Sequence, residues 1–229
     1  NVGTTLSSGG SGAIDFSGIT AGQASAFANL TSISNAGNLT FKDGTAFTAL
    51  STLTNTGGTL NFGASPVTLT TLNMTGGTLT GSGAITIPNG GALNWSGGTI
   101  DSTVAGTLLT TAAGSTTTLA VGGLGANRTW DNSGTVTQAA VGCCSQFTLN
   151  GTLNNQTGGT FILNNSLNNY GVQGTGTFNN AGELRKVLNT TVVSSPFTPA
   201  FNNLNSGVVN VDSGTLNLSG AGTDAAGSV

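Results

Sequence analysis

The chain has 229 residues, of which 36% are hydrophobic and 5% are charged, and it has no histidine. Globular domains have about 25% charged residues, so this composition is not typical of an enzyme surface, but it is too apolar for a disordered chain. A formal net charge of -3 with only four Lys and Arg residues excludes the basic surface that nucleic acids and anionic membranes attract.

The sequence also limits membrane insertion and cofactor binding. No run of about 18 apolar residues is present, so no membrane span is expected. The chain starts at Asn1 without a basic and apolar leader, so we expect a processed chain or a piece of a longer protein. Cys143 and Cys144 are adjacent and lack further Cys or His ligands, so neither a metal site nor a cofactor is expected.

The first segment with a distinct composition is residues 21–30, "AGQASAFANL". It is rich in Ala and lacks corner glycines, which favours a short helix that caps or flanks the first repeat. We predict one domain over residues 1–229, with an N-terminal cap or flanking segment at 1–34, regular coils at 35–220 and a polar tail at 221–229.

From residue 35 onward, one short phrase returns along the chain. Its copies are "NAGNLTF" (35), "TGGTLNF" (56), "TGGTLTG" (75), "SGGTIDS" (96), "NSGTVTQ" (132), "TGGTFIL" (157), "NAGELRK" (180), "NSGVVNV" (205) and "DSGTLNL" (212). Most copies are roughly 19 to 25 residues apart, the period of a solenoid in which one repeat forms one coil. After each glycine corner every second residue is apolar, as in Leu60 and Phe62, which predicts a half-buried strand.

Further short strands are expected between these copies, at 67–74, 83–88, 91–95 and 151–155. Each period therefore holds two or three strands, and such coils stacked in parallel make an all-β parallel β-helix, or β-solenoid. With one strand spacing of about 4.8 Å per coil, about ten coils would form a rod roughly 50 Å long.

Asparagine recurs at the predicted corners, at Asn35, Asn55, Asn132, Asn180 and Asn205. Stacked in register, each side-chain amide can donate to the carbonyl of the next, so we expect a structural amide ladder. Asn-x-Ser/Thr triplets also begin at Asn29, Asn38, Asn73, Asn94, Asn127, Asn150, Asn155, Asn164, Asn189 and Asn217. Chance explains such triplets in a chain this rich in Asn, Ser and Thr, and glycosylation stays open.

The phrases go beyond a generic repeat. The stretches "TLTTLNMTGGTLTGSGAITIPNGGALNWSGGTI", "GTFNNAGELRK" and "FNNLNSGVVNVDSGTLNLSG" resemble the repeats of very large secreted bacterial proteins, similar to filamentous haemagglutinin and autotransporter passenger stalks. The resemblance covers roughly residues 50–220 and implies a right-handed β-helix that leaves the cell and serves as an adhesin, stalk or fibre. It implies no catalytic residues.

A β-helix can also be a carbohydrate-active lyase or hydrolase, and glycoside hydrolysis needs two carboxyl groups about 5 to 10 Å apart. The acidic residues of this chain are scattered singly, and Asp101 and Asp131 are the pair that could meet across coils. The chain cannot form a Ser-His-Asp triad because it lacks histidine.

The densest charge lies in "FNNAGELRKV", residues 178–187, where we expect Glu183, Arg185 and Lys186 to form a solvated surface patch. Strand alternation predicts that Glu183 and Arg185 share the outer face. Leu184 faces the opposite way, and Lys186 or Val187 continues the alternation of faces. A role of this patch in binding surface glycans or a partner subunit remains an alternative.

Two other features allow alternatives. Thr-x-Thr pairs at Thr52/Thr54, Thr68/Thr70, Thr78/Thr80 and Thr135/Thr137 raise the alternative of an ice-binding solenoid, although their uneven spacing favours ordinary exposed strands. Cys143 and Cys144 are expected either to be buried, to close on each other at a turn, or to cross-link neighbouring chains.

We therefore expect a non-enzymatic, extracellular protein of a bacterial cell surface, forming part of a fibre, filament or adhesin. The last strong strand lies close to the C-terminus, and "AGTDAAGSV" is too small and polar to cover it. An uncovered β-helix end invites another coil, so we expect partners to be copies of this chain stacked head to tail, or further repeats of a longer chain.

Overall fold

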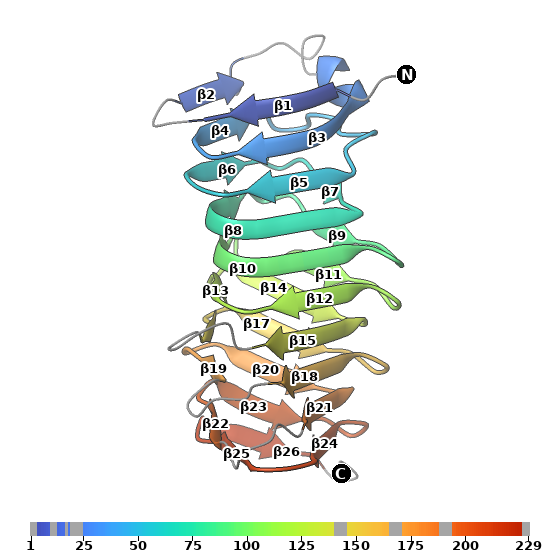
Figure 1. Ribbon diagram of the computed structural model, residues 1–229, viewed down its shortest axis with the longest axis vertical. Coiled ribbons are helices and arrows are strands. Elements are labelled where there is room, and N and C mark those ends of the chain that lie inside the picture. Colours follow the sequence, from blue (N-terminus) through green and yellow to red (C-terminus); the bar gives the residue numbers. More distant parts are fainter. Residues whose placement is uncertain are drawn as a thin grey trace.

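The computed structural model describes residues 4–9, 13–16, 18, 25–139, 146–164, 171–187 and 194–225. In this part of the chain, short strands stack as successive coils of one elongated rod, with the N- and C-terminal coils at opposite ends (Figure 1). The strands at the front of Figure 1 run leftward while the chain descends, so the coil is right-handed. The protein is an all-β solenoid, as the repeat predicts.

Three parallel ladders of strands run along the rod. The first ladder, at the front of Figure 1, consists of β1 (Thr4–Ser8), β3 (Leu30–Asn35), β5 (Thr52–Asn55), the first half of β8 (Thr71–Thr80), the first half of β10 (Ala92–Ile100), β12 (Thr116–Leu119), β15 (Thr135–Ala139), β18 (Thr160–Asn164), β21 (Glu183–Lys186) and β24 (Val208–Val211). Each strand pairs with the next in this order, so the described residues form ten coils on this side.

The second and third ladders complete the coils. The second ladder consists of β2 (Ala13–Phe16), β4 (Asn38–Phe41), β6 (Thr59–Asn61), the second halves of β8 and β10, β13 (Gly122–Leu124), β16 (Phe147–Leu149), β19 (Val172–Gln173), β22 (Ser194–Phe197) and β25 (Thr215–Leu218). The third ladder is a separate eight-stranded sheet of β7 (Val67–Thr68), β9 (Ile85–Ile87), β11 (Thr107–Thr111), β14 (Arg128–Asn132), β17 (Thr152–Asn155), β20 (Thr177–Asn180), β23 (Ala200–Asn203) and β26 (Gly222–Asp224).

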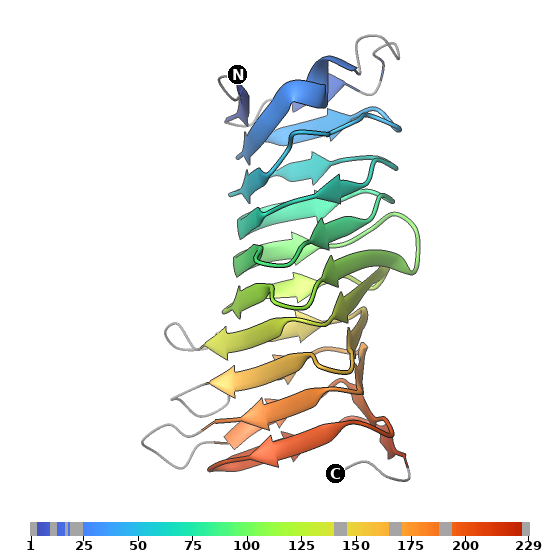
Figure 2. The same cartoon turned by 90° about the vertical axis from the view of Figure 1, so that its right-hand side faces the viewer.

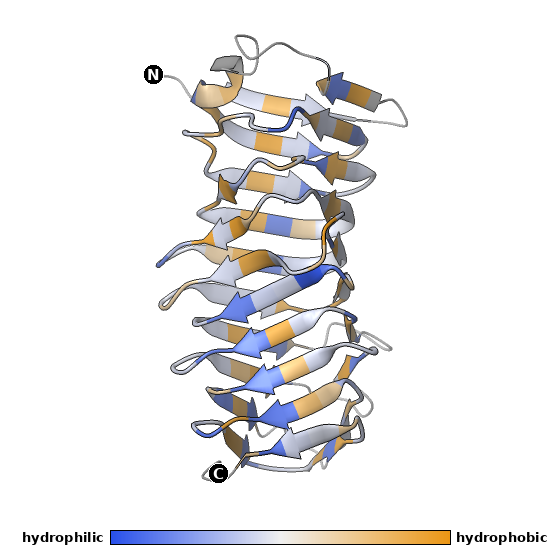
Figure 3. Ribbon diagram, turned by 180° about the vertical axis from the view of Figure 1, so that it is seen from behind, coloured by the Kyte–Doolittle hydropathy of each residue, from blue (hydrophilic) through white to orange (hydrophobic). Residues whose placement is uncertain are grey.

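The core runs along the axis of the rod as columns of inward side chains. In the first ladder Leu53, Leu72 and Leu93 stack in register, and in the third ladder Trp130 stacks on Leu153. All five are fully buried, because alternate residues of each strand point inward. Figure 3 shows the same alternation as apolar and polar bands along single strands, and Figure 2 shows the coils stacked along the whole rod.

Glycine is required where the first ladder turns into the second. Gly58, Gly77 and Gly98 stack at this corner with positive φ angles of 58°, 67° and 76°. A Cβ atom at Gly77 would lie 2.4 Å from the carbonyl oxygen of Gly58 in the coil above. Any other residue would therefore force the coils apart at this corner.

The two ends of the coil region differ from the expected boundaries. β1 and β2 already form ladders with β3 and β4, so coils begin before residue 35, and β26 lies within the expected polar tail. The expected helix at 21–30 is the short 3-10 helix η1 (Ser25–Asn29), and residues 21–24 lie outside the described part. η1 places Phe27 against Phe41, with ring centroids 5.2 Å apart.

Candidate functional site

The charge cluster of the sequence lies on β21, near the C-terminal end of the rod. Glu183 and Arg185 point outward, and each is held by the next coil. The Nδ2 atom of Asn210 donates to Glu183 Oε1 at 2.7 Å, and Arg185 forms an ion pair with Asp212 at 2.9 Å. Because Arg185 and Asp212 are both partly solvent-accessible, this ion pair contributes little to stability.

Lys186 does not belong to this surface patch. Its side chain is 1% exposed and points inward, stacked in register below Leu163. The reason is the alternation of β21, in which Leu184 and Lys186 face the core while Glu183 and Arg185 face solvent. Burial lowers the pKa of the Lys186 ammonium from its ordinary value.

A buried asparagine row runs along the corner where the third ladder turns into the first. Asn132 donates to Asn155 at 2.8 Å, Asn155 donates to Asn180 at 2.9 Å, and Asn180 donates to Asn203 at 2.9 Å. Thr111 caps the row by donating its hydroxyl to Asn132 Oδ1 at 2.8 Å. We call these residues the inner row; their amides also donate to the carbonyls of Gly134, Glu183 and Val208, which fixes each corner.

The expected ladder needs two corrections. Asn35 and Asn55 form a separate short row at the corner where the first ladder turns into the second, and Asn35 Nδ2 donates to Asn55 Oδ1 at 2.6 Å. Asn205 is exposed in a turn, and Asn203 occupies the position in the inner row. The turn of this coil is two residues longer than the turn after Asn180, so the Asn that lies two residues before glycine falls outside the row.

A second amide row, which the sequence analysis missed, lies on the outer face of the third ladder. Asn202 donates to Asn179, Asn179 to Asn154, and Asn154 to Asp131, at 2.8, 2.8 and 2.7 Å. The amides of this outer row donate toward the N-terminus, whereas those of the inner row donate toward the C-terminus. Alternation of "TLNN", "TFNN" and "AFNN" could have indicated both rows, since each has two adjacent Asn residues.

Arg128 is a second buried cation that the sequence analysis did not single out. It is 1% exposed and its guanidinium donates to the carbonyls of Asp101, Gly81, Gly83 and Leu108 at 2.6 to 3.2 Å. Desolvation lowers the pKa of Arg128 to about 10, against the opposing effect of Asp101. The side chain links the corners of successive coils. It points inward because Arg128 and Trp130 lie two positions apart on β14 and therefore share one face.

The two carboxylates considered for catalysis each have a structural hydrogen bond. Asp101 Oδ1 accepts the backbone N–H of Ser102 at 2.8 Å and that of Asn127 at 3.2 Å. Asp131 accepts the amide of Asn154 in the outer row. Among the residues with described positions, no group of three or more Cys, Asp or Glu side chains forms a metal site.

The threonine pairs lie on different sides of the rod. Thr52/Thr54 and Thr135/Thr137 belong to the outer face of the first ladder. Thr68 lies on the third ladder and Thr78/Thr80 on the second. In the first ladder, the positions between these two pairs are filled in register by Thr71/Asn73, Ala92/Asn94 and Thr116/Thr118. Variable coil length therefore does not disturb their alignment.

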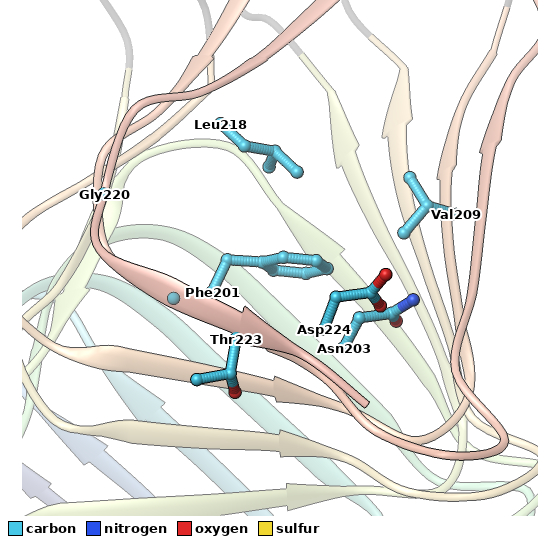
Figure 4. A pocket seen from close by; sticks show the side chains of 8 residues that line it. Phe201, Asn203, Val209, Leu218, Gly220, Thr223 and Asp224 are labelled. Atoms are coloured by element: carbon cyan, nitrogen blue, oxygen red, sulfur yellow. The ribbon is translucent and has the colours of Figure 1, made fainter. Parts of the chain in front are cut away.

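The last described coil leaves a hollow of about 480 Å³ at the C-terminal end of the core (Figure 4). Phe201, Val209 and Leu218 face it, and Asn203 and Asp224 lie side by side at its edge. The residue in register after Phe201 is Gly222, which has no side chain to continue the column. Leu218, which stacks on Phe197, is 39% exposed.

The remaining sequence predictions concern the cysteine pair and membrane insertion. Cys143 and Cys144 lie outside the described residues. No helix in the described part of the chain is long and apolar enough to cross a membrane.

The fold and the residue rows define the class of protein: this chain is a β-solenoid repeat protein, stabilised by axial columns of apolar side chains and by amide rows. Comparison with protein families, curated proteins and solved structures gives no match.

Proposed function

We propose that this protein is a non-enzymatic structural segment of a bacterial surface fibre, filament or adhesin, and that its C-terminal coil receives a further coil end on. The observation that carries the proposal is the hollow at β24, β25 and β26, where the apolar column stops at Gly222 and inward Leu218 is 39% exposed. A coil placed there would extend the first and second ladders and bury this apolar surface.

The added coil comes either from a second copy or from further repeats of a longer chain. In both cases its strand would pair in parallel with β24, in the way that β24 pairs with β21. A head-to-tail contact of this kind does not close on itself and propagates into a filament. The proposed extracellular location rests on the resemblance to secreted bacterial repeats. If it is right, antibodies to the chain should label intact cells of the source organism.

The experiment compares two lysine substitutions on the same strand by negative-stain electron microscopy and sedimentation. Leu218→Lys puts a charge on the inward position of β25, and Asn217→Lys puts the same charge on the adjacent outward position. We expect the unmodified chain and Asn217→Lys to form rods several times the length of one molecule, and Leu218→Lys to form single rods. Single rods from the unmodified chain at every concentration would contradict end-on stacking of copies.

The outer face of the first ladder supports ice binding as a second candidate function. From β5 to β15 it presents two ranks in register, Thr52-Thr71-Ala92-Thr116-Thr135 and Thr54-Asn73-Asn94-Thr118-Thr137, with no charged residue. Hydrogen bonds from Asn94 to Asn73 and from Asn73 to Thr54 hold the second rank in place.

Thermal hysteresis and inhibition of ice recrystallisation test this candidate. Thr118→Tyr should abolish both activities, and Thr152→Tyr on the outer face of the third ladder should leave them unchanged. Absence of both activities in the unmodified protein would eliminate ice binding.

A further inference from the structure

A groove lies on the outside of the rod, at the corner between the third and first ladders. It has a volume of about 430 Å³ and is lined by the turns and strand starts of β18, β21 and β24, on the right of Figure 1. The polar groups that line it belong to Thr157, Thr160, Glu183, Ser206 and Asn210. We call it the turn groove.

Unequal turn lengths create the turn groove. The turns at 156–159 and 204–207 have four residues each, whereas the turn at 181–182, in the coil between them, has two. The short turn is therefore recessed between two longer ones. The longer turns meet above it, where the hydroxyls of Thr157 and Ser206 lie 3.3 Å apart.

The inner row keeps the walls of the turn groove in place from behind. Asn155 donates to the carbonyl of Gly159 at 3.3 Å and to that of Glu183 at 3.0 Å. Asn203 donates to the carbonyl of Gly207 at 3.3 Å, and Ser206 donates to the carbonyl of Ala181 at 2.7 Å. Because these bonds fix the turns before any ligand arrives, little ordering cost remains for binding.

The chemistry of the turn groove favours a neutral ligand with many hydroxyl groups. Its carboxylate, Glu183, is held at Oε1 by Asn210, and no described residue donates to Oε2. A carboxylate accepts hydroxyl protons, the side-chain carbonyl of Asn210 accepts them beside it, and the serine and threonine hydroxyls both donate and accept. An anion would be repelled by Glu183, and Val208 is the one large apolar side chain in the lining, which has no aromatic residue to stack on an aromatic ligand.

We propose that the turn groove binds one sugar unit of a neutral polysaccharide, with Glu183 accepting hydrogen bonds from adjacent sugar hydroxyls. Arg185 and Asp212 neutralise each other 2.9 Å apart, so they supply no net charge for an ionic ligand beside the groove. The other hydroxyls and the Asn210 carbonyl complete a ring of polar groups around the recessed turn.

The test is a nuclear magnetic resonance titration of the full chain with neutral hexasaccharides of glucose and of N-acetylglucosamine. We expect at least one of them to shift amide signals of the turns at 156–159, 181–182 and 204–207. Glu183→Gln should weaken binding about tenfold or more, because it removes hydrogen bonds to a charged acceptor. Asp43→Asn removes an exposed carboxylate on a distant coil and should leave the affinity unchanged.

Two further measurements test whether the turn groove itself is the binding site and whether its ligand is a sugar. Ala181→Gln fills the recess without changing charge, and it should abolish the shifts while circular dichroism shows the coil fold intact. Absence of shifts with both hexasaccharides, or equal affinity of Glu183→Gln, would overturn the proposal. Shifts of the same turns with calcium chloride but not with either sugar would also overturn it, because they would make the groove a cation site.

Discussion

The inner row makes the strongest prediction about stability, through the substitution Asn155→Ala. The side chain of Asn155 accepts from Asn132 and donates to Asn180 Oδ1 and to the carbonyl of Glu183. Its removal leaves Asn180 Oδ1, in a residue that is 0% exposed, without a donor. An orphaned buried acceptor costs about 1–3 kcal/mol and each further lost bond about 1 kcal/mol, so we expect a loss of about 3–5 kcal/mol.

Asn154 provides the matched control on the same strand. It points to the opposite face, where it bonds to Asp131 and Asn179 in a partly buried row. Water can replace those bonds, so Asn154→Ala should cost less than about 1 kcal/mol. Urea unfolding monitored by circular dichroism measures both free energies of unfolding. Equal losses for the two variants would refute the view that burial of the inner row gives it its stabilising effect.

Three further predictions concern buried polar side chains. Thr117 lies in the column of Leu93 and Val136, and its hydroxyl has no hydrogen-bond partner, so Thr117→Val should raise the urea midpoint and stabilise the fold by about 1 kcal/mol. Arg128→Met removes the donor to four carbonyls, so the free energy of unfolding should fall by about 3–5 kcal/mol. Burial lowers the pKa of Lys186 below 10.5, so between the two values the unfolded chain binds more protons and stability rises with pH. This rise of stability with pH should be absent in Lys186→Met. Urea unfolding of the unmodified chain and of Lys186→Met at a series of alkaline pH values measures the two free energies of unfolding.

Each of these predictions has a clear contrary outcome. A lower midpoint for Thr117→Val would indicate that the Thr117 hydroxyl contributes to stability. Unchanged stability of Arg128→Met would show that water satisfies the four carbonyls. Parallel pH curves for the unmodified chain and Lys186→Met would place the ammonium of Lys186 in contact with solvent.

The coil architecture could be predicted from the sequence because it depends on local signals. Each glycine corner is followed by a period of two, which identified inward residues such as Leu60, Phe62 and Leu184. The same period also places Lys186 and Arg128 inward. We expected Lys186 on the surface because of its charge, and we made no prediction for Arg128. Burial of a cation depends on carbonyls from other coils, as at Arg128, and no short phrase records those.

The asparagine rows show a different limit of sequence analysis. "NAG" at Asn180 and "NSG" at Asn205 are alike in sequence, yet only Asn180 lies at the end of its strand. The turn after Asn203 is longer, as is the turn after Asn155, so the residue that stacks is not the one two positions before glycine. Turn length depends on how successive coils align, which a single repeat does not reveal. The turn groove could not be predicted from the sequence for the same reason.

The direction of the strand pairing has a mechanical consequence. Hydrogen bonds between neighbouring coils point along the rod, and the first and last described coils lie at opposite ends of it (Figure 1). A tensile load on the ends would therefore peel coils away one after another, with a similar force for each. Adding coils would therefore make the rod longer under load without raising the force that it withstands.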